Sequence, residues 1–432
     1  MMIIKNVNIV SMKSKNVDND QNIVIRHGII EAIGNQPSSP ESDCKVIDAR
    51  GQYIMPGLIN MHTHLGDNPD DLLLYLVNGV TTIRNMWGYE AFRLGHYVFG
   101  TRVFRHLELK KQISEGRIPG PDIYTSGALL DGNPPFFPKF MYVHAIKDIG
   151  QIRKIIKMQA NKGYDFIKIY SKLSLENFDD IMHIAKEFNM PVAGHVPDAV
   201  GLKHALESQM RSVEHLYGFV NPYFPEKNLK KETIKQMAGI AASNNVWNCP
   251  TLIANKRLTH FQNQAEYERE NSLSYVSQRN IKIMRFIIKE SRKVFEKAGL
   301  ADPQAYMEKL FYIIRQLKSE GAGILLGTDK SVPYVVAGFS EHEEMQLLSQ
   351  AGLTNYEIIC ASTINAARCL GNKTKIGTIE IGNKADLILT EKNPLDDLRT
   401  IFSHLGVVKN GVYYSREACN NILAEIKKHS KK

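Results

Sequence analysis

The chain has 432 residues, of which 43% are hydrophobic and 23% are charged, and its formal net charge is +9. This composition is typical of a globular protein large enough to bury a core without covalent cross-links. Its five cysteines are scattered without a CxxC pair, which argues against a disulfide framework and favours a reducing, cytoplasmic location. No signal-peptide core or apolar run of membrane-spanning length is visible, so we expect no membrane association.

Most of the excess positive charge lies in residues 226–320. We interpret this segment as a solvated basic helical face, with a positive rim that attracts anionic substrates as the alternative. No zinc finger, Gly-rich phosphate loop or RNA-binding signature accompanies the charge, so nucleic acid is not expected as a partner.

Short β-rich segments occur at both ends of the chain. The N-terminal segment contains "IIKNVNIV" and "NIVIRHGIIEAIG", and the C-terminal segment contains "GTIEIGNKADLILTE" and "LGVVKNGVYYS". Turn residues separate these runs, as between strands. We therefore predict one small β-sandwich domain built from residues 1–55 and 375–432, with a terminal helix.

Between these ends, residues 56–374 alternate short apolar runs with helical stretches, the pattern of a parallel α/β fold. The number of runs predicts a (β/α)8 TIM barrel with insertions. The eight runs are "PGLINMHTH", "GVTTIRNM", "DIYTSG", "DFIKIY", "PVAGHV", "SVEHLY", "NVWNCPTL" and "GILLGTD".

Two connections between these runs are long. One is an aromatic, Pro-rich stretch at residues 129–144, after the third run, and the other is a basic helical stretch at residues 253–321, after the seventh. Connections that follow strands open onto the carboxyl face of such a barrel. We expect both connections to cover an active site at that face. The alternative is that they only pack against the barrel and have no role at the site.

The first apolar run ends in His62 and His64, which point the same way if the run is a strand. Two neighbouring imidazoles at the mouth of a barrel suit a metal ion with open coordination positions. Core histidines satisfied by hydrogen bonds are the alternative interpretation.

Other strand ends carry residues of similar chemistry. His195, His215 and Asp329 end the fifth, sixth and eighth runs, and Lys168 lies within the fourth. An unpaired lysine inside a barrel is costly to bury, and burial lowers the pKa of its amine, which can then react with carbon dioxide to form a carbamate. A structural lysine paired with a carboxylate is the alternative.

The order "PGLINMHTHL", "DFIKIY", "GHV", "EHLYG", "LLGTD" resembles the amidohydrolase superfamily of metal-dependent hydrolases. The later "TINAARCLG" and "GTIEIGNKADLIL" are similar to that family's last helix and its return to the β-domain. Within the superfamily, the chain most resembles the prolidase-like and imidazolonepropionase-related branch.

The resemblance implies a binuclear site with two divalent metal ions, with zinc as the default. His62 and His64 would bind the first ion with Asp329 nearby, His195 and His215 would bind the second, and N6-carboxylated Lys168 would bridge them. A metal-bridging hydroxide would be the nucleophile. Asp329 would accept its proton and pass it to the leaving group.

Several further residues are candidates for substrate contact, with core or surface packing as the alternative for each. They follow the predicted strands or lie on the connections around them. They are Arg84, His144, Tyr170, Tyr217 and His342.

The sequence therefore predicts an enzyme that hydrolyses a C–N amide bond in a small, carboxylate-bearing substrate, such as an Xaa-Pro-like dipeptide or an N-acyl amino acid. Alternatives are a lactone, phosphotriester or cyclic amide hydrolase, the last resembling imidazolonepropionase, and a metal-dependent deaminase. A barrel kept only as a binding module would have lost the predicted ligands, and all six are present. The oligomeric state, a homo-oligomer included, is left open.

Overall fold

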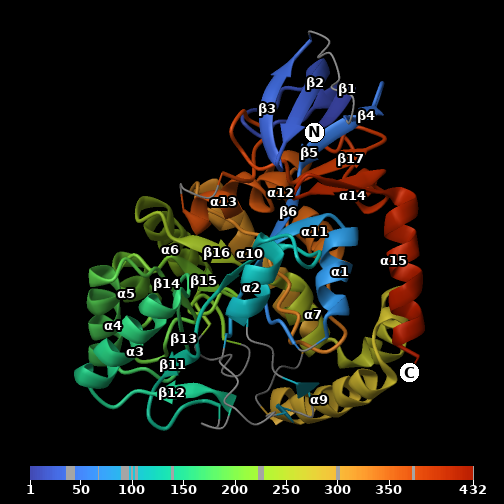
Figure 1. The fold of residues 1–432 in the computed structure, drawn as a ribbon. Coiled ribbons are helices and arrows are strands. Elements are labelled where there is room, and N and C mark those ends of the chain that lie inside the picture. The colour runs from blue at the N-terminus through green and yellow to red at the C-terminus, as the bar shows by residue number, and fades with distance from the viewer. Residues whose placement is uncertain are drawn as a thin grey trace.

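In the computed structural model, strands from the N-terminal and C-terminal segments of the chain form one sheet above a larger α/β body, and α15 (Arg416–His429) then runs down to the C-terminus beside that body (Figure 1). The structure describes residues 1–35, 44–66, 68–88, 97–98, 101–102, 106–137, 141–221, 228–297, 302–371 and 375–431.

The terminal sheet has eight strands in the order β19-β18-β17-β5-β1-β2-β3, and β4 pairs with β1. All of its described strands belong to one hydrogen-bonded sheet, so the packing of two sheets that defines a sandwich stays a prediction. The strands are β1 (Met2–Ile9), β2 (Asp18–Arg26), β3 (Ile29–Gly34), β4 (Lys45–Asp48), β5 (Tyr53–Pro56), β17 (Leu387–Thr390), β18 (Gly406–Lys409) and β19 (Val412–Ser415).

The α/β body contains two parallel sheets, ordered β10-β7-β6 and β12-β11-β13-β14-β15-β16. The strands are short, and their apolar residues are buried as the sequence predicts. They are β6 (Leu58–Thr63), β7 (Val80–Asn85), β10 (Asp122–Thr125), β11 (Leu129–Asp131), β12 (Val143–Ala145), β13 (Ile167–Ile169), β14 (Val192–Gly194), β15 (Ser212–Glu214) and β16 (Trp247–Cys249).

Single bridges join these two sheets into a TIM-barrel-like arrangement that is not closed by regular strand pairing. Ser126 bridges to Phe166 at one junction, and Asn248 bridges to Ile324 at the other. The eighth predicted run, residues 323–329, forms no regular strand, but Leu326 accepts a hydrogen bond of 2.8 Å from the backbone N–H of Met61. Residues from all eight predicted runs therefore surround the same interior.

Helices connect and cover the strands of the body. Side-chain caps fix several of their first turns: Asp148 accepts from the N–H of Gln151 and Ser174 from that of Asn177. The helices are α1 (Asp70–Val77), α2 (His106–Ser114), α3 (Ile149–Lys162), α4 (Leu175–Glu187), α5 (Leu202–Glu207), α6 (Lys231–Ser243), α7 (Leu252–Thr259), α8 (Gln264–Tyr267), α9 (Gln278–Lys297), α10 (Pro303–Ser319), α11 (Ser340–Gln350), α12 (Asn355–Ala361), α13 (Ile364–Leu370), α14 (Arg399–Phe402) and α15 (Arg416–His429).

Remaining elements are short. They are the 3-10 turns Phe261–Asn263 and Asn271–Tyr275 and the paired strands β8 (Tyr97–Val98) and β9 (Thr101–Arg102). No described helix has the length and apolar character needed to cross a membrane.

Buried ion pairs join the terminal sheet to the body. Lys409 of β18 is 2% exposed, and its amine lies 2.8 Å from Asp386 and 3.0 Å from Asp122 of β10. Burial alone would lower the pKa of Lys409, but the two carboxylates hold it above its ordinary value. The chain itself makes a second junction, because β5 continues into β6 with only Gly57 between them.

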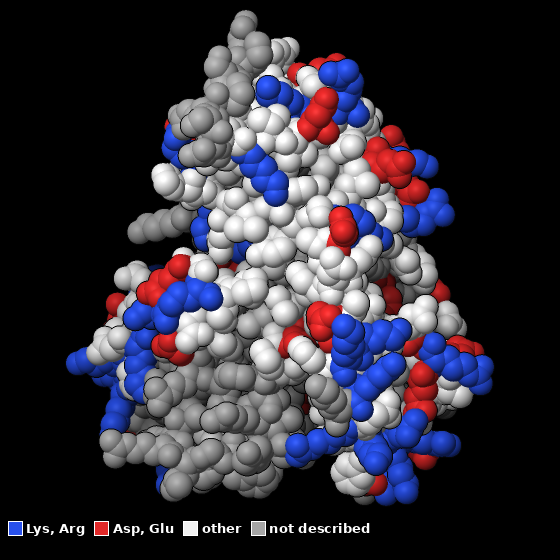
Figure 2. Space-filling model, turned by 45° about the vertical axis from the view of Figure 1, so that its right-hand side comes forward, with Lys and Arg blue, Asp and Glu red and all other residues white. Residues whose placement is uncertain are grey.

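Helix α9, which belongs to the basic segment, lies on the side of the body away from the terminal sheet (Figure 1). Lys and Arg gather on this lower side, interspersed with Asp and Glu (Figure 2). On α9, Arg285, Arg292 and Lys293 each lie within 3 Å of a glutamate oxygen. This pairing favours the interpretation of a solvated, charged face.

Candidate active site

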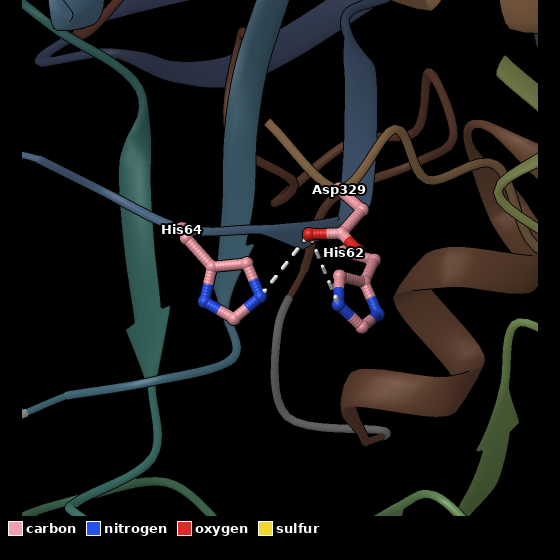
Figure 3. A group of neighbouring side chains, drawn as sticks. All are labelled: His62, His64 and Asp329. Carbon is pink, nitrogen blue, oxygen red and sulfur yellow. Dashed lines mark ion pairs between the residues drawn. The ribbon is translucent and has the colours of Figure 1, made fainter. Parts of the chain in front are cut away.

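The end of β6 brings two histidines to the aspartate that ends the eighth predicted run. The Nε2 atom of His64 lies 3.2 Å from Oδ1 of Asp329, and the Nε2 atom of His62 lies 3.9 Å from the same oxygen (Figure 3). Ligand atoms of the three residues lie within 4.8 Å of one another, so they could hold one metal ion. The backbone N–H of Asp329 donates to the carbonyl of His62, which fixes the two segments together.

His215, at the end of β15, reaches the same aspartate. Its Nε2 atom lies 3.8 Å from Oδ2 of Asp329, and its ring centre lies 4.4 Å from that of His62. His195, after β14, lies next to His215, with ring centres 5.0 Å apart. The structure thus brings together His62, His64, His195, His215 and Asp329.

Three of these histidines use the Nδ1 atom within the protein. Nδ1 of His62 lies 2.6 Å from Glu214, Nδ1 of His195 lies 3.0 Å from Oγ of Ser171, and Nδ1 of His215 lies 2.7 Å from Oγ1 of Thr251. Partners at Nδ1 leave Nε2 as the nitrogen available to a metal ion. The buried Nε2 atom of His62 has no hydrogen-bond partner among the described residues. A divalent metal ion would fit this donor set, because it would satisfy that nitrogen.

Burial keeps these imidazoles neutral. It lowers the pKa of His62 to about 4, and it also brings the pKa values of His195 and His215 well below their ordinary value. Burial alone would raise the pKa of Asp329, but the hydrogen bond with His64 and the neighbouring histidines hold that pKa well below its ordinary value. Neutral imidazoles and an ionised carboxylate are the forms that bind metal ions.

Lys168 lies in the middle of β13 and is 2% exposed. Burial lowers the pKa of its amine to about 8, although Glu214 and Asp329 oppose the shift. The neighbouring strand pairs Lys168 with Ala193, two residues before His195. The lysine therefore belongs to the same interior as the histidines and titrates near neutral pH.

The backbone at the site adopts an uncommon conformation. His215, Leu216, Thr251 and Asp329 have positive φ values of 58°, 57°, 46° and 52°. Non-glycine residues seldom occupy this left-handed region, and such residues cluster at functional sites. Adjacent residues of a regular strand point to opposite faces. The left-handed turn at His215 instead lets both Glu214 and His215 reach the site.

Two of the predicted substrate contacts flank His195. The ring of Tyr217 stacks on His195 with centres 4.2 Å apart and planes at 17°, and the ring of Tyr170 lies 4.0 Å away. Tyr170 and Tyr217 therefore lie beside a candidate ligand, where a substrate would bind.

The other three predicted contacts lie differently. Arg84 is buried, and its guanidinium donates to Glu214 at 2.8 Å, to Ser212 at 3.0 Å and to the carbonyl of Met61 at 2.6 Å. His342 stacks on Phe402 and lies 3.3 Å from the carbonyl of Asn78, away from the metal-binding group.

His144 lies on β12 and is partly buried, which lowers its pKa. The hydrogen bonds of Arg84 and the contacts of His342 are therefore within the protein. Lys330, which the sequence places next to Asp329, forms an ion pair with Asp71.

Glu214 is the functional residue that sequence reasoning missed. Both of its oxygens are used, one by His62 and one by Arg84, and it is completely buried. Burial alone would raise its pKa, but Arg84 and His62 lower it, so the carboxylate is ionised. Cys249 also lies within reach of His62 and Glu214, but burial raises the pKa of its thiol. The sequence did contain a sign of this role, because Glu214 is a charged residue within an apolar run and directly precedes the candidate ligand His215.

The pattern of the amidohydrolase family matches residues 53–413. The chain belongs to the amidohydrolase family. It is a hydrolytic enzyme, and members of this family typically use divalent metal ions.

The alignments with curated relatives cover most of this chain and most of each relative. Ochratoxinase of Aspergillus niger is 24% identical over 426 residues, which cover 87% of this chain and 78% of the relative. The 5'-deoxyadenosine deaminase of Methanobrevibacter smithii is 26% identical over 400 residues, covering 86% of this chain and 80% of the relative.

Solved structures share the fold. A bottromycin amidohydrolase superposes with a TM-score of 0.78 at 24% identity, covering 99% of this chain and 90% of the other. A Xaa-Pro dipeptidase with bound methionine has a TM-score of 0.72 at 20% identity, covering 96% of this chain and 99% of the other. These relatives include prolidase-like enzymes, as the sequence motifs suggested.

Proposed function

We propose that this amidohydrolase cleaves a C–N amide bond in a small substrate, using divalent metal ions held by His62, His64 and Asp329 together with His195, His215 and Lys168. The observation that carries the proposal is the buried Nε2 of His62. It is oriented by Glu214, lacks a hydrogen-bond partner among the described residues and faces Asp329.

A bound metal ion would supply an activated water and polarise the substrate carbonyl. Residues of the protein would transfer the proton and position the metal ligands. Asp329, which is ionised and lies next to His64, would accept a proton and deliver it to the leaving nitrogen. Glu214 and Arg84 would hold His62 in position through the buried contacts between them.

We propose that two ions bind, with zinc as the default, and that Lys168 becomes carboxylated. Its amine attacks carbon dioxide, one N–H proton leaves, and an anionic carbamate forms. The lowered pKa of Lys168 supports this step, because only the neutral amine reacts.

An amide substrate is favoured by the names of two relatives, ochratoxinase and the Xaa-Pro dipeptidase. The second candidate is a deamination, favoured by the deaminase relative. A lactone, phosphotriester or cyclic amide would also suit the same donor set. A carboxylate on the substrate and a cytoplasmic location stay predictions from the sequence.

The predicted division into residues 1–55, 56–374 and 375–432 also stays a proposal. It is supported by the pairing of β5 with β17, which joins the two ends of the chain.

Metal analysis combined with an activity panel tests the function. The purified protein should contain about two divalent ions per chain and hydrolyse members of a panel of dipeptides and N-acyl amino acids. Ammonia release from amino-purine nucleosides, with no hydrolysis on that panel, would instead establish the deaminase.

A further inference from the structure

Five aromatic side chains lie beside the candidate metal site. Four of them contact one another, and the fifth, Tyr217, is joined to them through the ring of His195. We call Trp87, Phe136, Phe137, Tyr170 and Tyr217 the aromatic arc. Trp87 lies 5.2 Å from Phe137 between ring centres, and Phe137 lies 5.2 Å from Tyr170. Phe136 lies 5.5 Å from Tyr170. These separations are those of interacting aromatic rings.

Both ends of the arc reach candidate metal ligands. Trp87 lies 6.2 Å from His64, while Tyr170 and Tyr217 lie on either side of His195 at 4.0 and 4.2 Å. A substrate whose scissile bond lies among His64, His195 and Asp329 would therefore present its neighbouring group to these rings.

The protein holds the arc in place before any ligand binds. Asp131 is fully buried, and its two oxygens accept backbone N–H groups from Phe136 and Lys172, each at 2.6 Å. One carboxylate thus ties the segment carrying Phe136 and Phe137 to the segment that follows Tyr170. The indole of Trp87 also donates to the carbonyl of Tyr142 at 3.3 Å.

The arc is partly open to solvent, since Phe136 is 42% exposed. Two cations near the site are paired within the protein, Arg84 with Glu214 and Lys330 with Asp71. The arc itself offers a flat apolar surface. That surface suits a planar aromatic group better than a charged or purely aliphatic one.

We propose that the aromatic arc selects substrates that carry an aromatic group on one side of the scissile amide, with Phe137 and Trp87 as specificity-determining residues. This inference rests on the proposed amide hydrolysis, and it deepens it by naming the substrate class.

Matched substrates test the proposal. N-benzoyl-L-alanine is compared with N-cyclohexanecarbonyl-L-alanine, and N-acetyl-L-phenylalanine with N-acetyl-L-cyclohexylalanine, because each pair differs in flatness more than in size. In at least one pair kcat/KM should favour the aromatic member by roughly tenfold, the scale of one or two aromatic contacts. Equal values within both pairs would overturn the proposal and leave the amidase function intact.

Variants locate the effect. In Phe137→Leu that preference should fall several-fold while the metal content is unchanged, which shows that the site still forms. Phe402→Leu removes a ring that contacts His342 instead, and the preference should stay at the wild-type value. A preference that survives both Phe137→Leu and Phe136→Leu would contradict the role of the arc.

Ligand binding gives a readout that does not need activity. The chain has two tryptophans, Trp87 and Trp247. N-benzenesulfonyl-L-alanine, whose sulfonamide resists hydrolysis, should change the fluorescence of the metal-loaded protein more than N-methanesulfonyl-L-alanine does, and Trp87→Phe should abolish the change. Such binding without amidase activity would reject the proposed function and retain the aromatic site. Equal responses to both ligands would reject the aromatic site.

Discussion

The Nδ1 atom of His62 lies 2.6 Å from a carboxylate oxygen of Glu214, and both side chains are completely buried. This contact orients the ring, because a hydrogen bond at Nδ1 leaves Nε2 for the site. Glu214 cannot rotate away from His62 without also breaking its ion pair with Arg84.

Glu214→Gln should therefore weaken metal binding. Loss of such an orienting partner typically reduces metal affinity about 10- to 100-fold. Competition with a chelating indicator measures the dissociation constant. Glu341→Gln serves as the control, because Glu341 is equally buried but bonds to Asn60 and Thr328 instead of a candidate ligand. Equal affinities in the two variants would contradict the orienting role of Glu214.

Lys168→Ala should lose most activity and bind one metal ion fewer than the wild type. Small carboxylates such as acetate should restore part of the activity, since they can replace a bridging carbamate. Metal analysis and rates with and without acetate measure both effects. Lys172→Ala, an exposed lysine that follows the same strand, is the control. Wild-type activity in Lys168→Ala would show that no such bridge is needed.

Asp329→Asn should reduce kcat with little change in folding. A positioned proton-transfer group contributes about 10²- to 10⁴-fold, and the amide cannot accept a proton. Steady-state kinetics on the best substrate gives the loss, and circular dichroism checks the fold. The exposed Asp179→Asn on α4 is the matched control. A decrease smaller than tenfold would assign the proton transfer to another group.

Lys409→Met should destabilise the chain strongly, because it leaves the buried Asp386 without its ion-pair partner, while Asp122 keeps the amine of Lys384. Breaking a buried pair in this way costs about 3–5 kcal/mol. Chemical denaturation measures the free energy of unfolding, with exposed Lys428→Met as the control. A double variant that also carries Asp386→Asn should recover part of the loss, since Asp122 keeps Lys384; no recovery would mean that the unpaired charge is not the cause.

Glu341 should make stability depend on pH. Burial raises its pKa to about 7 from the ordinary 4.5, so the folded protein retains a proton that the unfolded chain releases. This contribution is fully present below about pH 4.5 and is lost as pH rises through about 7. Each unit of pKa difference is worth about 1.4 kcal/mol.

Glu341→Gln fixes the neutral form. Between about pH 4.5 and pH 8, its free energy of unfolding should fall by roughly 3 kcal/mol less than that of the wild type. Denaturation curves across this range measure the difference, and the exposed Glu176→Gln should follow the wild type. Parallel pH profiles of Glu341→Gln and the wild type would show that Glu341 is ionised in the fold.

The sequence predicts most of the framework of the site, because strand ends carry both a periodic apolar signal and an unusual polar residue. Seven of the eight predicted runs contain a strand, and the histidines and Asp329 lie together. The eighth run forms no regular strand, because it is joined to the neighbouring strands by isolated hydrogen bonds and a single bridge instead of a continuous ladder. A short apolar segment of sequence thus predicts that its residues are buried more reliably than it predicts regular strand pairing.

What the sequence could not predict depends on contacts between distant segments. Strict strand alternation would separate Glu214 from His215, and the left-handed turn at His215 is not visible in the residue type. Arg84 is a candidate for substrate contact or for packing from the sequence alone, because its partner, Glu214, lies 130 residues away along the chain. His342 follows the barrel's last run yet turns towards Phe402.

The pairing of Ile54 in β5 with Leu389 in β17 has a consequence for how the enzyme is made. β5 leads through Gly57 directly into the strand that carries His62, so that strand is anchored by residues that are synthesised long after it. A nascent chain that still lacks β17 therefore holds that histidine on an incompletely paired strand. The enzyme should acquire its metal ions only after β17 has been made and has joined β5.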